Sequence, residues 1–178
     1  PARSATLAAL ACAHEAGCTL SYDPNYRANL WPSVEAAVEQ MRAVVPQMDL
    51  MKLSDEECAL LTGFDDPEAA AAALLAAGPK VVAVTLGAGG AYVRTADGGA
   101  TVPGFPADAV DATGAGDSFW GGFLAGFCES GKAAGEVTVE DAAGFARQGN
   151  AVASLCVRKR GAIPAMPTRP EVEALLGV

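Results

Sequence analysis

Basic residues are scarce in this chain of 178 residues. Twelve Lys and Arg stand against 21 Asp and Glu, which gives a net charge of −9. Nucleic-acid phosphates are bound by clustered cations, and the one basic run here is the short stretch 158–160. The composition therefore argues against nucleic acid as a partner, and an anionic ligand would have to rely on local groups.

Cysteine pairs and long apolar runs are also lacking. The five cysteines show no Cys-x-x-Cys spacing, and an odd number fits buried thiols in a reducing compartment better than a disulfide framework. No window approaches the ~20 uninterrupted apolar residues of a membrane span, and no basic segment followed by an apolar run opens the chain. We therefore expect a cytoplasmic protein without a membrane partner. The one histidine, His14, lies far from every motif, and we expect no function for it.

Two familiar nucleotide-binding fingerprints are incomplete. Neither residues 84–90 nor residues 114–119 complete Gly-x-Gly-x-x-Gly, and no Gly-Lys-Ser/Thr sequence supplies a Walker A loop. A dinucleotide-dependent oxidoreductase is therefore disfavoured. That alternative rests only on a predicted parallel sheet with a glycine turn.

Helical and strand-like patterns alternate along the chain, whose 51% hydrophobic content suits one domain over residues 1–178. Helices are expected over residues 4–15 with Ser4 as the cap, from 33 through 41, over 54–63, 69–77, 116–130 and 139–156, and after Pro170; strands are expected over 18–23, 48–53 and 80–86, with a hairpin within 90–101. Parallel neighbours need crossover helices, so this order predicts an α/β fold with a mostly parallel sheet and helices on both faces. The chain opens without Met and enters a helix at once, which we interpret as a piece of something longer.

One stretch, residues 111–119, combines turn chemistry with the start of a helix. Gly114, Ala115 and Gly116 leave backbone N–H groups uncovered at the positive end of a helix dipole, where an anion can bind. Asp117 lies inside this predicted anion site. Its carboxylate would repel a resting phosphate, yet it is well placed to accept a proton from a hydroxyl that attacks that phosphate. The alternative is that the glycines shape a loop and Asp117 caps the helix.

A second polar motif follows the first predicted strand, at residues 23–31. A carboxylate, an amide and a guanidinium fall on alternate residues, namely Asp23, Asn25 and Arg27. The Arg27 fork suits a phosphate or a carboxylate. The alternative is an Asx-turn with a surface arginine.

Two further motifs follow the next predicted strands. Ser54 and Glu57 have the spacing of a capping box, and the functional alternative is that Glu57 holds a hydrated Mg²⁺ near a nucleotide. Residues 84–90 lead from a strand into a glycine turn, which either admits the phosphates or ribose of a nucleotide or is only a tight turn. Because ligands gather at the carboxyl ends of parallel strands, we expect all these loops to share one rim of the sheet.

Together these motifs resemble one family. Asp-Ala-Thr-Gly-Ala-Gly-Asp at 111–117 looks like the C-terminal signature of the ribokinase-like (PfkB) carbohydrate kinases, Asp-Thr-x-Gly-Ala-Gly-Asp. Three further matches stand in the family's order, at 23–31, 52–63 and 85–90. The resemblance covers essentially the whole chain and implies the ribokinase-like three-layer α/β/α fold with a small β-hairpin.

The resemblance also implies roles for individual residues. Asp117 would deprotonate a sugar hydroxyl, and the amides of Gly114, Ala115 and Gly116 would hold the transferring phosphoryl group. Cofactor contacts are implied for the nucleotide ATP at Thr85, Gly87, Gly90, Asn150, Asn25 and Arg27, for Mg²⁺ through water at Glu57, and for a monovalent cation such as K⁺ at Asp111 and Thr113.

The implied activity is transfer of the γ-phosphate of ATP to a sugar hydroxyl. Ser54 and the motif at 23–31 resemble the fructokinase branch, and the alternatives are a 2-keto-3-deoxygluconate kinase, a ribokinase, or a nucleotide-binding fragment without activity. The family's N-terminal sugar-binding and lid part has no match in this chain. Because the family often dimerises through that lid, a homodimer is an expectation for the full-length enzyme only.

Two residues depart from the family pattern. Trp120 stands where smaller or polar residues are frequent, which predicts altered packing beside the nucleotide. Ala165 stands where a hydroxyl residue can support the cation, which weakens the cation assignment.

Overall fold

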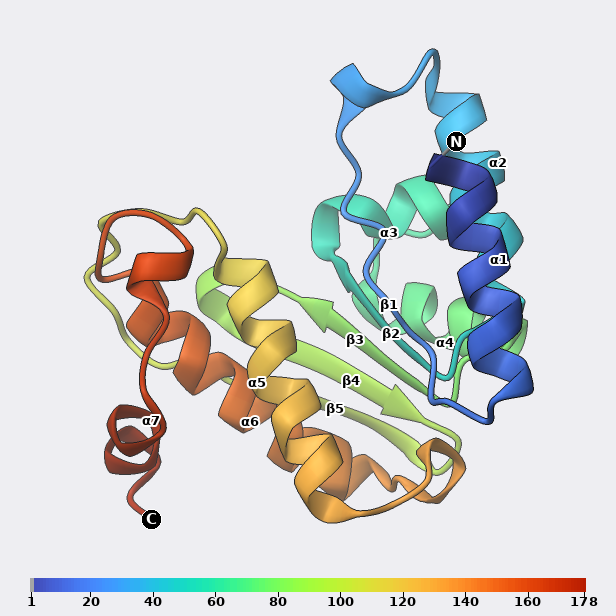
Figure 1. Ribbon diagram of the computed structural model, residues 1–178. Helices are drawn as coiled ribbons and strands as arrows, with labels where there is room; N and C mark the ends of the chain where they lie inside the picture. The colour runs from blue at the N-terminus through green and yellow to red at the C-terminus, as the bar shows by residue number, and fades with distance from the viewer. Residues whose placement is uncertain (1) are drawn as a thin grey trace.

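Short apolar segments assemble into one mixed sheet in the computed structural model, which describes residues 2–178 (Figure 1). The strands lie in the order β1-β2-β3-β4-β5, with bounds β1 Ser21–Tyr22, β2 Leu50–Ser54, β3 Val81–Thr85, β4 Ala91–Thr95 and β5 Gly98–Val102. β1, β2 and β3 are parallel, whereas β4 and β5 continue the sheet as an antiparallel hairpin. The predicted parallel sheet with a small hairpin is thus confirmed.

Helices connect the parallel strands, as this topology requires. Between β1 and β2 lie η1 (Ala28–Leu30), α2 (Val34–Val44) and η2 (Val45–Gln47), and between β2 and β3 lie α3 (Asp55–Thr62) and α4 (Pro67–Ala77). The other elements are α1 (Ala2–Glu15), η3 (Gly87–Gly89), α5 (Ala115–Ser130), η4 (Ala134–Glu136), α6 (Val139–Cys156), η5 (Ile163–Ala165) and α7 (Arg169–Leu176).

Two apolar cores lie on opposite faces of the sheet, because alternate strand residues point to opposite sides. Leu50 and Val81 pack with the aromatic side chains of α5 and α6. Met51 and Val82 pack with α2, α3 and α4 on the other face. Figure 1 shows the resulting α/β/α arrangement, so the predicted three-layer architecture is confirmed.

Helix α5 is anchored to the sheet by a row of aromatic residues. Phe123 is fully buried, stacks on Trp120 with ring centroids 4.8 Å apart, and meets Phe145 of α6 edge to face. Burying a side chain of this size contributes about 1.5–3 kcal/mol. The position of the α5 N-terminus over the sheet is therefore determined by this core.

Several predicted boundaries differ from the structure. α1 starts at Ala2, so Ser4 lies inside its first turn and the predicted Ser4 cap is wrong. α4 starts at Pro67 because the Asp66 carboxylate accepts a hydrogen bond from the N–H of Ala69. β1 comprises only two residues of the predicted strand, because it is an edge strand and the chain enters a turn at Asp23.

The exposed surface has two further features. None of the side chains of α1 is buried, although the helix carries several apolar residues. Among the helices of residues 2–178, none is both long and apolar enough to cross a bilayer.

Candidate active site

Contacts between the ends of three neighbouring strands bring the predicted loops together. The Lys52 ammonium group pairs with Asp23 Oδ2 at 3.0 Å, which joins the loops after β1 and β2. The Tyr26 N–H donates to Glu57 Oε1 at 2.6 Å, and the Thr85 hydroxyl donates to the Leu53 carbonyl at 3.4 Å. The carboxyl ends of the parallel strands thus form one polar rim, as the sequence predicts.

The turn at residues 112–116 leads directly into α5 and packs tightly. Gly114 has φ +77°, and a Cβ there would lie 2.6 Å from the Cβ of Ala162. The Ala115 N–H is taken by the Ala112 carbonyl at 3.1 Å. Within residues 2–178, no hydrogen bond uses the N–H of Gly114, Gly116 or Asp117. Three backbone donors therefore remain free in the turn and at the start of the helix, and Ala115 supplies none of them.

Asp117 lies in the first turn of α5 and is exposed. No hydrogen bond or ion pair in the described part of the chain involves its carboxylate. Asp117 is therefore not engaged as a structural cap, and its oxygens are free to accept a proton.

Lys52 lies directly beneath this turn. A Cβ on Gly116 would lie 2.9 Å from Lys52 Nζ, so the glycine allows the ammonium group to approach the backbone. The motifs in the sequence did not single out Lys52 as a site residue. The available signal was a lysine near the end of the predicted strand 48–53, between apolar residues that are buried on both faces of the sheet.

A large pocket of about 1050 Å³ opens beside the turn. Its wall includes Gly87, Ala115 and Asn150, and the other lining residues are Ala88, Gly104, Phe105, Pro106, Ala107, Asp108, Ala109, Val110, Ala112, Ala153, Ser154, Val157 and Arg158. The volume and the mostly apolar lining with a few polar groups suit a nucleotide-sized ligand. Of the residues predicted to contact ATP, Gly87 and Asn150 line this pocket.

The other predicted ATP residues have structural contacts. Gly90 has φ +97°, and a Cβ there would lie 2.1 Å from the Val102 carbonyl, so only glycine fits against β5. The Thr85 hydroxyl donates to the Leu53 carbonyl of the neighbouring strand β2. Even Asn150 uses its side-chain N–H₂ group within the protein, since it donates to the carbonyls of Val102 and Pro103 at 3.1 Å each.

The loop that follows β1 forms the Asx-turn considered from the sequence. The Asn25 N–H donates to Asp23 Oδ1 at 3.2 Å, and Asn25 itself has φ +47°. The Arg27 guanidinium is exposed and donates to the Tyr26 carbonyl at 2.8 Å. Neither Asn25 nor Arg27 lines the large pocket.

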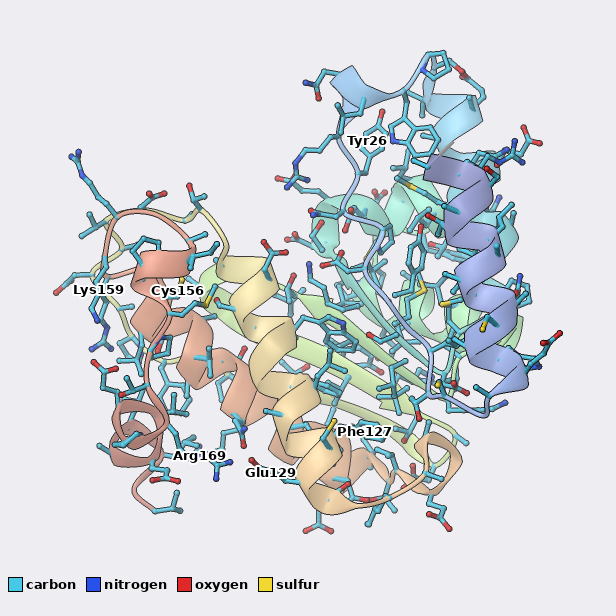
Figure 2. The ribbon with its side chains drawn as sticks, in the orientation of Figure 1. Tyr26, Phe127, Glu129, Cys156, Lys159 and Arg169 are labelled. Carbon is cyan, nitrogen blue, oxygen red and sulfur yellow. The ribbon has the colours of Figure 1, made fainter. Side chains whose placement is uncertain are left out.

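Glu57 holds this loop against α3. One carboxylate oxygen accepts from the Tyr26 N–H, and the other accepts from the N–H and the hydroxyl of Ser54 at 2.8 and 3.1 Å. Figure 2 labels Tyr26 on the loop that is tied down in this way. With three protein donors on a carboxylate that is 7% exposed, Glu57 is not free to ligate a metal directly. Residues 2–178 contain no cluster of three or more His, Cys, Asp and Glu side chains that could hold a metal ion.

Asp111 joins the turn before α5 to the loop before η5. Its Oδ1 accepts from the N–H and hydroxyl of Thr113, and its Oδ2 accepts from the Gly161 N–H at 2.9 Å. These hydrogen bonds lower the pKa of Asp111 to about 2, and the Thr113 hydroxyl contributes more than the N–H of Gly161. Asp111 is therefore a charged brace at the edge of the predicted cation site.

The two residues that depart from the family pattern lie apart from the large pocket. Trp120 is 7% exposed and does not line the pocket; its indole N–H instead contacts Ser21 of β1. Trp120 thus packs toward the sheet edge and away from the large pocket, because α5 turns this position toward β1. Ala165 is fully buried, and its N–H donates to the Ala162 carbonyl at 3.0 Å.

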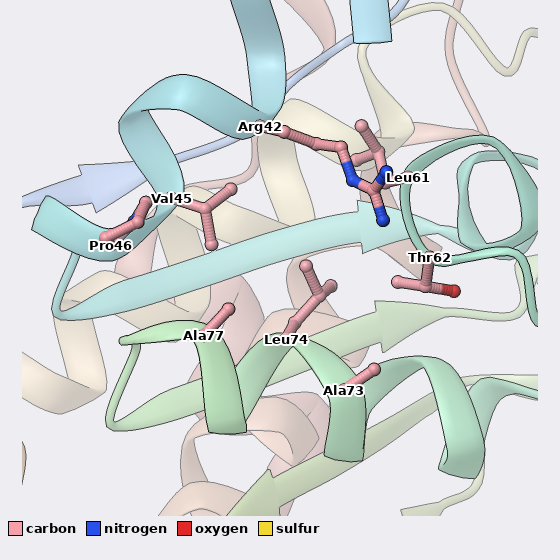
Figure 3. A pocket seen from close by; sticks show the side chains of 8 residues that line it. All are labelled: Arg42, Val45, Pro46, Leu61, Thr62, Ala73, Leu74 and Ala77. Carbon is pink, nitrogen blue, oxygen red and sulfur yellow. The ribbon is translucent and has the colours of Figure 1, made fainter. Parts of the chain in front are cut away.

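A second, smaller cavity of about 220 Å³ lies between α2, α3 and α4 (Figure 3). Its lining is mainly apolar, with Arg42 and Thr62 as the polar members, and includes Val45 and Leu74. None of the predicted site residues lines it. The polar chemistry is therefore concentrated at the rim beside Asp117.

Comparison with known proteins finds fructokinases among the relatives. Probable fructokinase-4 of Arabidopsis thaliana is 42% identical over 180 residues, which cover 99% of this chain and 54% of the relative. Fructokinase-2 of Zea mays is 40% identical over 178 residues, which cover 99% of this chain and 52% of the relative. The chain thus spans about half the length of the curated relatives it matches.

Solved structures agree in fold. A double mutant of fructokinase from Vibrio cholerae O395, in its fructose, ADP and potassium ion bound form, has a TM-score of 0.88 at 34% identity and is matched over 99% of this chain and 56% of its own. Aminoimidazole riboside kinase from Salmonella enterica, complexed with aminoimidazole riboside and an ATP analog, has a TM-score of 0.86 at 29% identity. The match covers 100% of this chain and 59% of that kinase. The family profile described as pfkB family carbohydrate kinase matches residues 1–169. The chain therefore belongs to the pfkB family of carbohydrate kinases.

Proposed function

We propose that the full-length protein is an ATP-dependent sugar kinase of the fructokinase type, which transfers the γ-phosphate of ATP to a sugar hydroxyl. The observation that carries the proposal is the exposed carboxylate of Asp117, which has no partner among residues 2–178. It follows directly on the unused N–H of Gly116. A proton acceptor and an anion-binding turn thus lie within one turn of a helix.

Phosphoryl transfer asks mainly for positioning and charge stabilisation. The Asp117 carboxylate would orient the attacking hydroxyl and accept its proton. The free N–H groups of Gly114, Gly116 and Asp117 would donate to the oxygens of the phosphoryl group, where the positive end of the α5 dipole adds to their effect.

ATP supplies the phosphoryl group when bound, and the large pocket beside Ala115 fits a nucleotide in size and lining. Gly87 and Asn150 would lie beside it, while Thr85 and Gly90 would shape the turn from behind. For K⁺, the acidic Asp111 and the hydroxyl of Thr113 are the proposed neighbours. Mg²⁺ would reach Glu57 only through water, because three protein donors already occupy its carboxylate.

Fructose is the proposed acceptor, supported by relatives named fructokinases at about 40% identity. 2-Keto-3-deoxygluconate and ribose are the other acceptors to test. Because the chain spans about half of its relatives, the residues present here could alternatively bind a nucleotide without turning over a sugar.

The test compares Asp117→Asn with a matched control in the full-length protein. Glu140→Gln removes another exposed carboxylate from the first turn of a helix, far from the large pocket. Asp117→Asn should lower turnover by about 10²–10⁴-fold, the usual contribution of a positioned proton acceptor. Binding of Mg-ATP by calorimetry should be kept or strengthened, since a negative charge next to the phosphates is removed. Glu140→Gln should change neither quantity.

A coupled kinase assay with the three sugars ranks the acceptors. Turnover of Asp117→Asn within a few fold of wild type would contradict the assignment of the base. ATP binding without turnover on any sugar would favour the nucleotide-binding alternative.

A further inference from the structure

We propose that Lys52 is a further catalytic residue, whose ammonium group contacts the phosphoryl group during its transfer. This inference rests on the proposed kinase function and adds a cation to the site. Four observations support it: the register of β1 and β2, the burial of Lys52, its unused donors, and its closeness to Gly116.

Strand register places Lys52 beneath the α5 turn. Leu50 faces the core under α5 and α6, and period-two alternation puts Lys52 on the same face. β1 and β2 pair in parallel with Tyr22 opposite Met51, so the next residues, Asp23 and Lys52, also lie side by side. The strand thus carries one charged side chain to the rim, between the Asp23 loop and the turn at Gly116.

Burial makes this lysine unusual. At 5% exposure, it is the only Lys or Arg among residues 2–178 whose side chain is buried. A buried ammonium group destabilises the fold unless partners compensate for the lost water. Asp23 Oδ2, at 3.0 Å, is its single ion-pair partner in the described chain.

The hydrogen-bonding capacity of Lys52 is mostly unused. An ammonium group has three N–H donors, and one of them binds Asp23. No other acceptor among residues 2–178 takes a hydrogen bond from Lys52 Nζ. The remaining donors lie next to Gly116, where a Cβ would come within 2.9 Å of Nζ. Two free donors on a buried cation, beside the free N–H of Gly116, form a site for an anion.

Lys52 gives up no proton during the phosphoryl transfer. The sugar hydroxyl oxygen forms a bond to the γ-phosphorus, the bond from that phosphorus to the bridging oxygen of ADP breaks, and the hydroxyl proton goes to Asp117. Lys52 donates hydrogen bonds to the phosphoryl oxygens and keeps its charge throughout, while Asp23 holds it in place.

A double-mutant cycle in the full-length protein separates this role from a merely structural one. Lys52→Met should lower kcat by about 10²–10³-fold, the usual loss for one oxyanion donor, with little change in the KM for sugar. Asp23→Asn should have a smaller effect. If Lys52 serves only to neutralise Asp23, the double variant will recover the activity of Asp23→Asn; we expect it to stay as slow as Lys52→Met. Lys80→Met changes an exposed lysine directly before β3; it is the control and should behave as wild type.

Binding of ADP with aluminium fluoride, a mimic of the phosphoryl group, gives a readout that needs no turnover. Lys52→Met should weaken binding of the mimic by at least tenfold while leaving binding of ADP alone unchanged. If Lys52→Met does not fold, the double variant, which buries no unpaired charge, carries the same measurement. If the wild type phosphorylates no sugar, the proposed function fails, and the mimic still decides the role of Lys52. Unchanged mimic binding, or recovery of turnover in the double variant, would overturn the inference.

Discussion

The indole N–H of Trp120 donates to the Ser21 hydroxyl at 2.9 Å, and this hydrogen bond joins helix α5 to the edge strand β1. Trp120 lies one turn after Asp117, and Ser21 lies two residues before Asp23. The bond therefore links the helix that carries the proposed base, Asp117, to the strand β1, which is followed by Asp23, the ion-pair partner of Lys52. Since β1 comprises two residues and pairs on one side only, this side-chain contact is one of its few anchors.

Removing the acceptor at Ser21 should destabilise the protein. Ser21→Ala leaves the buried indole N–H of Trp120 without a partner, which costs about 1–3 kcal/mol of unfolding free energy. In a Trp120→Phe background, which keeps an aromatic ring near Phe123 and lacks the donor, the same change should cost less than 0.5 kcal/mol, the usual scatter of a surface substitution. Urea unfolding of the four proteins measures the coupling, and an equal cost in both backgrounds would argue against the bond.

Gly114 and Gly121 should respond to alanine in opposite directions. Gly114 has φ +77° and packs against Ala162, so alanine is strained and clashes, with a loss of more than about 1 kcal/mol. Gly121 lies inside α5, and its Cβ would meet nothing within 4 Å, so alanine there should stabilise the helix by about 0.5–1 kcal/mol. Thermal unfolding of both variants checks the contrast, and stabilisation by Gly114→Ala would contradict the geometry of the turn.

Glu57 should matter for the order of the loop after β1. Glu57→Ala removes the acceptor of the Tyr26 N–H and the capping contacts of Ser54, with an expected loss of about 1–3 kcal/mol. Hydrogen exchange at the Tyr26 amide should accelerate more than exchange in the strands. Glu56→Ala, at the exposed neighbouring position, is the control and should leave Tyr26 exchange unchanged. Equal Tyr26 exchange in both variants would show that Glu57 does not hold the loop.

The brace at Asp111 should make stability depend on acid pH. Its pKa in the folded protein is lowered to about 2, below the unfolded value of 3.8, so its contribution is complete above about pH 4 and is lost as the pH falls toward 2. Asp111→Asn should therefore lower the Tm at pH 6, and the difference from wild type should shrink between pH 4 and pH 2. A difference that stays constant over this range would rule out the charged brace.

Much of the fold could be predicted because local signals agreed with the tertiary structure. Val139–Cys156 forms a helix as the pattern predicts, and a hairpin lies where it was expected, although its turn is only Ala96 and Asp97 because Gly98 and Gly99 already pair with β4. The capping box of Ser54 and Glu57 is present. These features depend on residues near one another in the chain, and short-range spacing is what a sequence displays directly.

Other features depend on partners far away in the chain. The length of β1 follows from its pairing on one side only, and the side on which Trp120 packs follows from the rotation of α5 over the sheet. Asn150 lines the large pocket, and its side-chain N–H₂ group donates to the carbonyls of Val102 and Pro103, nearly fifty residues away in the chain. No spacing in the sequence specifies these contacts.

The sequence by itself determined the α/β order, the family, and the residues of the glycine turn that ends in Asp117, because each is written in local pattern and motif. Only the tertiary structure decided which of those residues are free to act. It engaged Glu57 and Asn150 in protein hydrogen bonds, left Asp117 and the Gly116 N–H without a partner among residues 2–178, and brought Lys52 beneath the turn. The physical reason is that parallel strand pairing sets residues distant in the chain side by side, and a buried charge is then used or neutralised by whatever lies next to it.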